Sequence, residues 1–313
     1  MQQSDRRDFL KASAAALAAG GLVMARRAAA AGQQPAPAAR GHKPLALGVC
    51  TSFVDNPEAA IADVHALEMP TCQVAARTLD DGLVKRLGAA LANHGVVATA
   101  LSTGGPGLIV YNFYDGPLTL GIVPRTYRAE RIEKLKKFSD FAKQIGIPAI
   151  RTHVGFIPED PSDPLYREAV ESLRDVCAYC KANGQDFLYE SGTETPVTLL
   201  RTIQDVGMEN QGVNLDTANF VLYGKANPLD ALDVLGPYVK NTHAKDGFYP
   251  TNPHDLGKEA PIPHGKVDFP RIIQRLKELN YQGPITIERE ISGPGWKDDV
   301  KRERDYLAKL IES

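Results

Sequence analysis

Four residues of metal-ligating types lie at the ends of four successive predicted strands in the second half of the chain. They are Glu190, Asp216, His243 and Glu288. Side chains alternate between the two faces of a strand, and inward-facing residues at neighbouring strand ends converge in a closed parallel barrel. Three carboxylates held together there would repel one another unless a cation lay between them. The spacing therefore predicts a metal site.

The donor types indicate which ion such a site would hold. Oxygen-rich ligation with one imidazole favours Mn²⁺, while Mg²⁺, Co²⁺ and Zn²⁺ are also compatible. Glu290 has the same strand parity as Glu288 and competes with it for the fourth position. A surface salt bridge is the simpler interpretation of any one of these carboxylates, but not of four at equivalent strand ends.

The elements that must position these residues follow from hydrophobic patterning. Short apolar runs alternate eight times with amphipathic helical segments, which predicts a parallel sheet closed as a single (β/α)8 TIM barrel over residues 44–313. Long loops at 102–123 and 247–267 fall on the face where such barrels place their chemistry. The expected strands lie at 45–49, 71–75, 96–101, 149–154, 186–190, 212–216, 239–244 and 284–288.

The N-terminus has the layout of an export signal. Arg6-Arg7 precede Phe9-Leu10-Lys11, an apolar run follows, and small residues suited to cleavage end near Ala31. This motif resembles the twin-arginine signal. It predicts a signal peptide at 1–31, a linker at 32–43, the translocation machinery as a partner, and a periplasmic or otherwise exported protein. A retained membrane anchor is the alternative interpretation.

Composition narrows the remaining classes. The net charge of −2 leaves no basic surface for nucleic acid, and we interpret the Lys/Arg-rich stretch 125–143 as a solvated helix face. Cys177 and Cys180 form a CxxC in a predicted helix without a second pair. This spacing favours core packing over zinc or redox chemistry, although export would permit a disulfide.

The strand ends Tyr-Glu-Ser-Gly (189–192), Asn-Leu-Asp-Thr-Ala-Asn (214–219), Asn-Thr-His-Ala-Lys-Asp-Gly (241–247) and Thr-Ile-Glu-Arg-Glu (286–290) resemble the xylose-isomerase-like barrel superfamily of sugar isomerases and epimerases. The resemblance covers about residue 44 to the C-terminus. In the epimerase branch the matching Glu, Asp, His and Glu bind one divalent metal. The two glutamates also move protons, which implies catalytic roles for Glu190 and Glu288.

Two departures from the family pattern affect the expected chemistry. Ketose 3-epimerases carry a pattern like Leu-Asp-x-x-His at strand six, and Asn219 occupies the position of its histidine. Many members carry His-x-His at strand seven, and Asn241 replaces the first of those histidines. Endonuclease IV, in the same superfamily, needs more histidines than this chain has. Further substrate contacts are expected from His153, Lys245, Asn219, His264 and Trp296. A structural lysine paired with Asp246 is the alternative for Lys245, and a satisfied histidine of the barrel core is the alternative for His153.

These observations lead to three functional hypotheses. The first is a metal-dependent isomerase or epimerase that abstracts a proton next to a carbonyl, through an enediolate, on an unphosphorylated sugar or keto-sugar. The second uses the same proton abstraction for elimination, as a dehydratase or a lyase on a keto-sugar or oxidised glycoside. The third is a periplasmic sugar-binding barrel without turnover. A homo-oligomer is compatible with all three.

Overall fold

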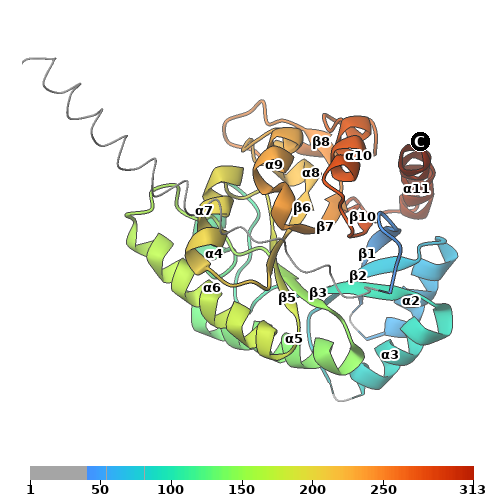
Figure 1. Cartoon of the computed structure of the whole chain (residues 1–313), viewed down its shortest axis with the longest axis horizontal. Coiled ribbons are helices and arrows are strands. Elements are labelled where there is room, and N and C mark those ends of the chain that lie inside the picture. The colour runs from blue at the N-terminus through green and yellow to red at the C-terminus, as the bar shows by residue number, and fades with distance from the viewer. Residues whose placement is uncertain (1–40, 54, 81) are drawn as a thin grey trace, which may run out of the picture. The chain divides into compact units, whose positions relative to one another are not determined.

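The protein is a closed barrel of eight parallel strands surrounded by helices (Figure 1). The computed structural model describes residues 41–53, 55–80 and 82–313. The predicted signal segment, 1–31, and residues 32–40 of the predicted linker lie outside the described residues. Around the barrel the strands follow the order β1-β10-β7-β6-β5-β4-β3-β2, and a separate two-stranded sheet pairs β8 with β9. The predicted fold is therefore confirmed.

The strand bounds agree with the predicted ones to within a few residues. The barrel strands are β1 (Leu47–Phe53), β2 (Thr71–Ala76), β3 (Val97–Ser102), β4 (Ala149–Thr152), β5 (Asp186–Glu190), β6 (Gln211–Asp216), β7 (Val239–Ala244) and β10 (Ile285–Ile287). The helices are α2 (Pro57–Ala66), α3 (Leu83–His94), α4 (Gly116–Thr119), α5 (Arg128–Ile145), α6 (Pro164–Ala182), α7 (Pro196–Val206), α8 (Thr217–Leu222), α9 (Pro228–Leu235), η1 (Gly236–Tyr238), α10 (Phe269–Glu278) and α11 (Trp296–Glu312).

Several helices of the described chain begin with the same local signal, a capping side chain followed by proline. Asn56, Asp163, Thr195 and Asn227 each accept a backbone amide of the first turn of α2, α6, α7 and α9. The proline at the next position needs no amide partner and already has the helical φ angle. These capping signals fix the residue at which each of these helices begins.

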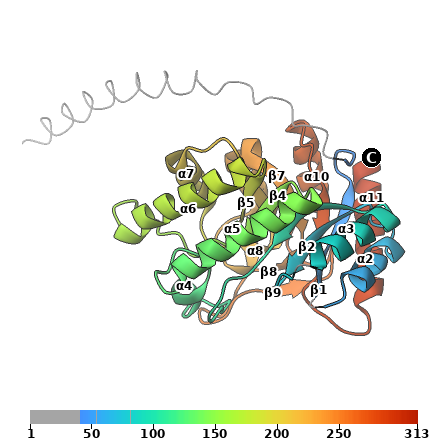
Figure 2. The ribbon, with the colours of Figure 1, turned by 90° about the horizontal axis from the view of Figure 1, so that it is seen from below.

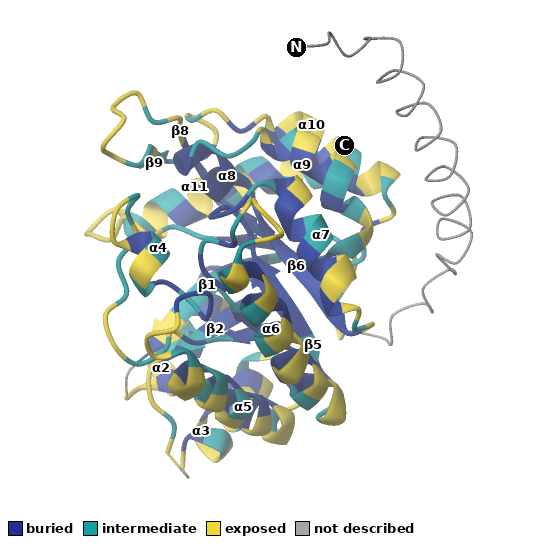
Figure 3. Cartoon of the chain, turned by 90° about the vertical axis from the view of Figure 1, so that its left-hand side faces the viewer, coloured by how far each residue is buried: buried dark blue, intermediate teal, exposed yellow. Residues whose placement is uncertain are grey.

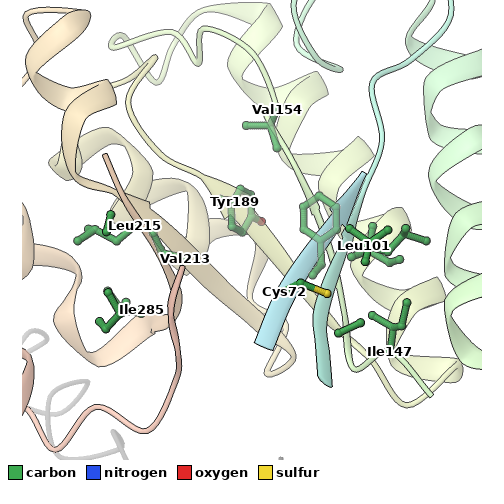
Figure 4. Close-up of a cluster of buried hydrophobic side chains, with 14 of the residues drawn as sticks. Cys72, Leu101, Ile147, Val154, Tyr189, Val213, Leu215 and Ile285 are labelled. Atoms are coloured by element: carbon green, nitrogen blue, oxygen red, sulfur yellow. The ribbon is translucent and has the colours of Figure 1, made fainter. Parts of the chain in front are cut away.

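The main core lies between the strands and the surrounding helices. Tyr189, Val213 and Leu215 belong to this outward-facing layer (Figure 4). Their sequence neighbours Glu190, Asn214 and Asp216 therefore point into the barrel. Coloured by burial, most of the barrel strands are dark blue and the helices turn their exposed faces outward (Figure 3). The alternation that packs the helices thus aims the polar residues inward.

The two long loops carry structure that the sequence did not predict. The first contains α4, and the second contains the antiparallel hairpin of β8 (Asp246–Phe248) and β9 (Lys258–Ala260). Both lie at the same end of the barrel (Figure 2). The Asp246 carboxylate holds the second loop closed, since it accepts the backbone amides of Gly247, Gly265 and Val267 at 2.8, 2.7 and 3.0 Å.

One arginine of the 125–143 stretch corrects the prediction of a solvated helix face. Arg131 is buried, and its guanidinium donates to the carbonyls of Pro106, Leu108, Thr119 and Gly121 at 2.6–3.1 Å. It therefore ties the first long loop to α5. A basic residue in a charged helix normally faces water, so composition alone gave no sign of this role.

The cysteines behave as predicted for the CxxC. Cys177 and Cys180 are free and buried within α6. Burial raises the pKa of the Cys180 thiol to about 12 and that of Cys177 further still, which leaves both thiols unreactive. Within the described part of the chain, no helix combines the length and the apolar character needed to cross a membrane.

Candidate metal centre

The four predicted ligands converge inside the mouth of the barrel. Glu190, Asp216, His243 and Glu288 come from β5, β6, β7 and the end of β10, and each offers one donor atom within 4.8 Å of all the others. Asp216 and His243 are direct register partners on adjacent strands. The barrel thus gathers residues that are far apart in the sequence, as strand parity predicted.

The imidazole of His243 is the centre of the cluster. Its Nδ1 lies 3.1 Å from Glu190 Oε1, 3.4 Å from Asp216 Oδ2 and 3.3 Å from Glu288 Oε2. On the far side of the ring, Nε2 lies 3.0 Å from Gln73 Oε1. If Nε2 carries the proton and donates it to Gln73, the lone pair of Nδ1 faces the carboxylates.

Two of these donor atoms have no hydrogen-bond partner although they are fully buried. They are Asp216 Oδ2 and His243 Nδ1. Buried polar atoms normally have hydrogen-bond partners. Two potential metal ligands that lack such partners and face a common centre therefore fit a divalent ion. Asp216 Oδ1, in contrast, caps α8 by accepting the Asn219 amide at 2.7 Å. One carboxylate thus both caps a helix and offers a free oxygen to the centre.

Two cations flank the cluster and pair with its carboxylates. Arg151 pairs closely with Glu190 Oε2, and Lys245 Nζ lies 3.0 Å from Glu288 Oε2 and 2.7 Å from Glu290 Oε2. Although burial opposes its charge, Glu288 and the other carboxylates raise the pKa of Lys245 well above its usual value, so it stays an ammonium. Lys245 therefore pairs with Glu288 and Glu290 rather than with Asp246.

The other titratable members of the cluster are shifted by the same neighbours. Burial lowers the pKa of His153 to about 3, and Arg151 adds to this effect, so His153 is neutral. Burial opposes a charge on His243, but Cys50 and Glu288 raise its pKa well above the usual value. Burial likewise raises the pKa of Asp216. The buried carboxylates therefore need a compensating positive charge, which a metal ion would supply.

A polar layer inside the barrel supports the centre from below. Gln73 Nε2 donates to Asn214 Oδ1 at 2.8 Å and to Asn241 Oδ1 at 2.9 Å. Asn241 in turn donates to Thr99 Oγ1 at 3.2 Å. Asn241, which replaces a family histidine, thus belongs to this supporting layer. Because Gln73 also contacts His243, the layer fixes the orientation of the imidazole.

A cavity of about 130 Å³ opens onto one side of the cluster. Glu190 and Glu288 line this cavity, whereas Asp216 and His243 do not. A small molecule in it would therefore meet the two glutamates first. Other polar lining residues include Arg131, Arg151, His153, Tyr111 and Glu290.

The expected substrate residues are not all brought together. His153 lines the cavity, with its Nε2 3.5 Å from Glu190 Oε1, and Lys245 Nζ lies 3.5 Å from Asn219 Oδ1 beside the cluster. His264 instead lines a separate cavity next to α11. The Trp296 indole donates to the Arg289 carbonyl at 2.9 Å and packs on the core. The substrate roles of all five remain predictions.

Two contributors were missed from the sequence, namely Arg151 and Gln73. Arg151 shares the inward parity of His153 on β4, and Gln73 is an isolated polar residue among apolar neighbours on β2. Parity would have flagged both. Tyr111 reaches the cavity from the first long loop and meets the His153 ring edge-on at 5.6 Å. No sequence period predicts the position of a loop residue.

Comparison with known proteins agrees with this geometry. The model of the family described as xylose isomerase-like TIM barrel matches residues 58–310. The chain belongs to this family. A twin-arginine translocation signal sequence matches residues 3–23, which indicates export through that pathway. The resemblance and the export signal expected from the sequence are both confirmed.

Individual relatives include a solved structure at moderate identity. A xylose isomerase domain protein from Planctomyces limnophilus is 32% identical with a TM-score of 0.77, covering 86% of this chain and 96% of that one. A D-psicose 3-epimerase structure determined with D-fructose is 16% identical with a TM-score of 0.66, covering 87% and 100%, and so shows the fold alone.

Among curated sequences, L-ribulose-5-phosphate 3-epimerase UlaE of Salmonella paratyphi A is 27% identical over 208 residues, 61% of this chain. The chain spans 62% and 64% of the lengths of two curated relatives that it matches, the first an uncharacterized protein of Methanocaldococcus jannaschii and the second this epimerase.

Proposed function

We propose that this protein is an exported, metal-dependent sugar epimerase or isomerase that moves a proton on a carbon next to a carbonyl. The observation that carries the proposal is that two of the four potential ligands line the cavity and the other two do not. Asp216 and His243 are buried behind the cavity, while Glu190 and Glu288 reach both the centre and the cavity from strands on different sides of it. Carboxylates placed on two sides of one carbon can remove and return its proton.

Glu190, Asp216, His243 and Glu288 would hold one divalent ion, and we favour Mn²⁺ for this oxygen-rich set. When bound, the ion supplies Lewis-acid stabilisation of the negative charge that develops on the substrate oxygens in an enediolate. The chain's own residues do the rest. Arg151 orients Glu190 through its outer oxygen, and the Lys245 ammonium keeps Glu288 ionised, since His243 and Lys245 outweigh burial and hold the pKa of Glu288 well below its usual range.

The cavity favours an unphosphorylated sugar or keto-sugar. Among the described residues that line it, the guanidinium of Arg131 is occupied by four carbonyls and Arg151 is paired with Glu190. The Arg131 guanidinium therefore has no group left for a phosphate, Glu190 already neutralises the charge of Arg151, and the carboxylates of Glu288 and Glu290 would repel a phosphate. Export also favours this choice, because sugar phosphates are mostly cytosolic. The polar substrate atoms would then be hydroxyl groups.

Exchange of the substrate α-proton with D₂O tests the proposal. Metal-loaded protein is screened by NMR against free sugars and 3-keto-sugars, and the wild type should exchange with one of them. Glu190→Gln and Glu288→Gln should each lower the exchange rate by about 10² to 10⁴-fold. Glu290→Gln is the matched control, because Glu290 lies on the same segment and lines the same cavity. Wild-type exchange in either of the first two variants would refute the assigned roles.

Elimination on a keto-sugar or oxidised glycoside is the second candidate, and the position of Lys245 favours it. Its ammonium lies beside Glu288 and near Asn219, where it could donate to a leaving oxygen after proton abstraction. The NMR product decides between the two, since a stereoisomer or isomer supports the first reaction and loss of water or an alcohol supports the second. Saturable binding of sugar without any exchange would instead indicate a binding protein.

A further inference from the structure

A thiol lies against the back of the candidate metal centre. Cys50, on β1, places its Sγ 3.3 Å from His243 Nε2. Cys50, His243 and Glu288 form a second donor set, in which each offers one atom within 4.8 Å of the other two. This set shares His243 and Glu288 with the oxygen-rich set but replaces two carboxylates by sulfur.

Cys50 differs from the other cysteines of the described chain in its accessibility. It is partly exposed, while Cys72, Cys177 and Cys180 are buried. Strand β1 pairs with β10, with Val49 opposite Ile287, so Cys50 and Glu288 follow directly on neighbouring strands. Cys50 and Glu288 can therefore offer ligands to one ion.

The chemistry of the two donor sets differs in a way that selects ions. Carboxylate oxygens suit Mn²⁺ and Mg²⁺, whereas a thiolate prefers softer ions such as Zn²⁺ and Cd²⁺. His243 can serve either set, because its Nδ1 faces the carboxylates and its Nε2 faces Cys50. Use of Nε2 as a ligand would break its contact with Gln73.

We propose that Cys50, His243 and Glu288 form an alternative site for a thiophilic divalent ion, which excludes the ion of the oxygen-rich set. Binding replaces the thiol proton by the metal, and that proton passes to solvent. The imidazole proton moves from Nε2 to Nδ1, where it faces the carboxylates, so that Nε2 can ligate; no redox change is involved. Because two of three ligands are shared, the two ions compete. A thiophilic ion would also occupy Glu288, and so would inhibit the proposed reaction. This inference rests on the proposed function, since it needs His243 and Glu288 to act as ligands.

Titration of metal-free full-length protein with Cd²⁺ tests the site. The thiolate-to-Cd²⁺ charge-transfer band in the ultraviolet should grow to saturation, and electron paramagnetic resonance should show bound Mn²⁺ released as Cd²⁺ is added. In Cys50→Ser the band should disappear, and the Cd²⁺ affinity should fall by at least about 10- to 100-fold, because the loss of even a hydrogen-bond partner of a metal ligand costs that much. The Mn²⁺ affinity should fall less than the Cd²⁺ affinity, because the four ligands of the oxygen-rich set stay in place and the serine hydroxyl can keep the contact with His243 Nε2.

Cys72→Ala is the matched control, because Cys72 lies in the apolar core on the neighbouring strand (Figure 4) and should leave the band intact. Circular dichroism checks that both variants fold. A band that survives in Cys50→Ser, or Cd²⁺ that binds without releasing Mn²⁺, overturns the proposal. Mn²⁺ binding with no Cd²⁺ band refutes this inference alone. Failure of the wild type to bind Mn²⁺ refutes the metal centre of the proposed function, whatever Cd²⁺ does.

Discussion

Asp216→Asn should separate the metal-binding role of Asp216 from its structural role. Oδ1 caps α8 through the Asn219 amide, and an asparagine oxygen can replace it, since asparagine is as good a cap as aspartate. Oδ2 has no hydrogen-bond partner, and burial raises the pKa of this carboxyl. The substitution therefore removes one charge from a crowded cluster but keeps the helix cap.

The expected magnitudes follow from ligand linkage. An ion at 100 times its Kd stabilises the folded state by about 2.7 kcal/mol. At about 2–4 °C per kcal/mol for a domain of this size, the melting temperature of the wild type should rise by about 5–11 °C. If the substitution weakens binding about 100-fold, the same concentration adds only about 0.4 kcal/mol, or about 1 °C.

Calorimetry of metal-free and Mn²⁺-loaded protein measures both effects. Without metal, Asp216→Asn should melt at or above the wild-type temperature, because it relieves repulsion among buried carboxylates. Asp63→Asn is a control, since Asp63 forms an exposed pair with Lys297 and should leave the metal shift unchanged. The reasoning is refuted if the metal-free variant melts several degrees below wild type, or if it keeps the full shift with Mn²⁺.

Two further predictions concern residues around the site. Arg131→Met leaves four loop carbonyls without their donor, so limited proteolysis within 103–121 should accelerate and kcat/KM should fall roughly tenfold or more. Exposed Lys137→Met is the control, and equal proteolysis of the two variants would contradict the loop's dependence on Arg131. Burial raises the pKa of Glu303 from 4.5 to about 7, so the folded state holds this proton more tightly and its unfolding free energy falls as pH rises between those values. Denaturant unfolding at pH 5 and pH 7.5 measures this fall in unfolding free energy, and Glu303→Gln should reduce it by about 3 kcal/mol at most. An unchanged fall would exclude Glu303 as its source.

Hydrophobic patterning was the reason that so much of the barrel could be predicted. The predicted strands 186–190 and 239–244 coincide with β5 and β7, because short strand-like runs alternate with amphipathic helical segments along the chain. The hairpin of β8 and β9 was missed because its strands have three residues each, too few to show a period.

The candidate site could be predicted only as far as its ligands. Their residue types and equivalent positions were visible, but the groups that support them depend on tertiary contacts. Gln73 meets Asn214 across 141 residues of sequence, and Arg151 reaches Glu190 from the adjacent strand. Arg131 lies in a charged helix and resembles a surface residue until the loop that it binds is placed against it.

Two adjacent residues just after β7, Lys245 and Asp246, have separate roles at the barrel mouth. Lys245 faces the carboxylates inside, while Asp246 turns outward and gathers three amides of the second long loop. The conformation of that loop therefore depends on an anchor that is separate from the chemistry. Evolution, or a protein engineer, can exchange the hairpin for one of another length and sequence. A graft that preserves this single aspartate would keep the loop anchored and leave the four predicted ligands and the residues that line the cavity unchanged.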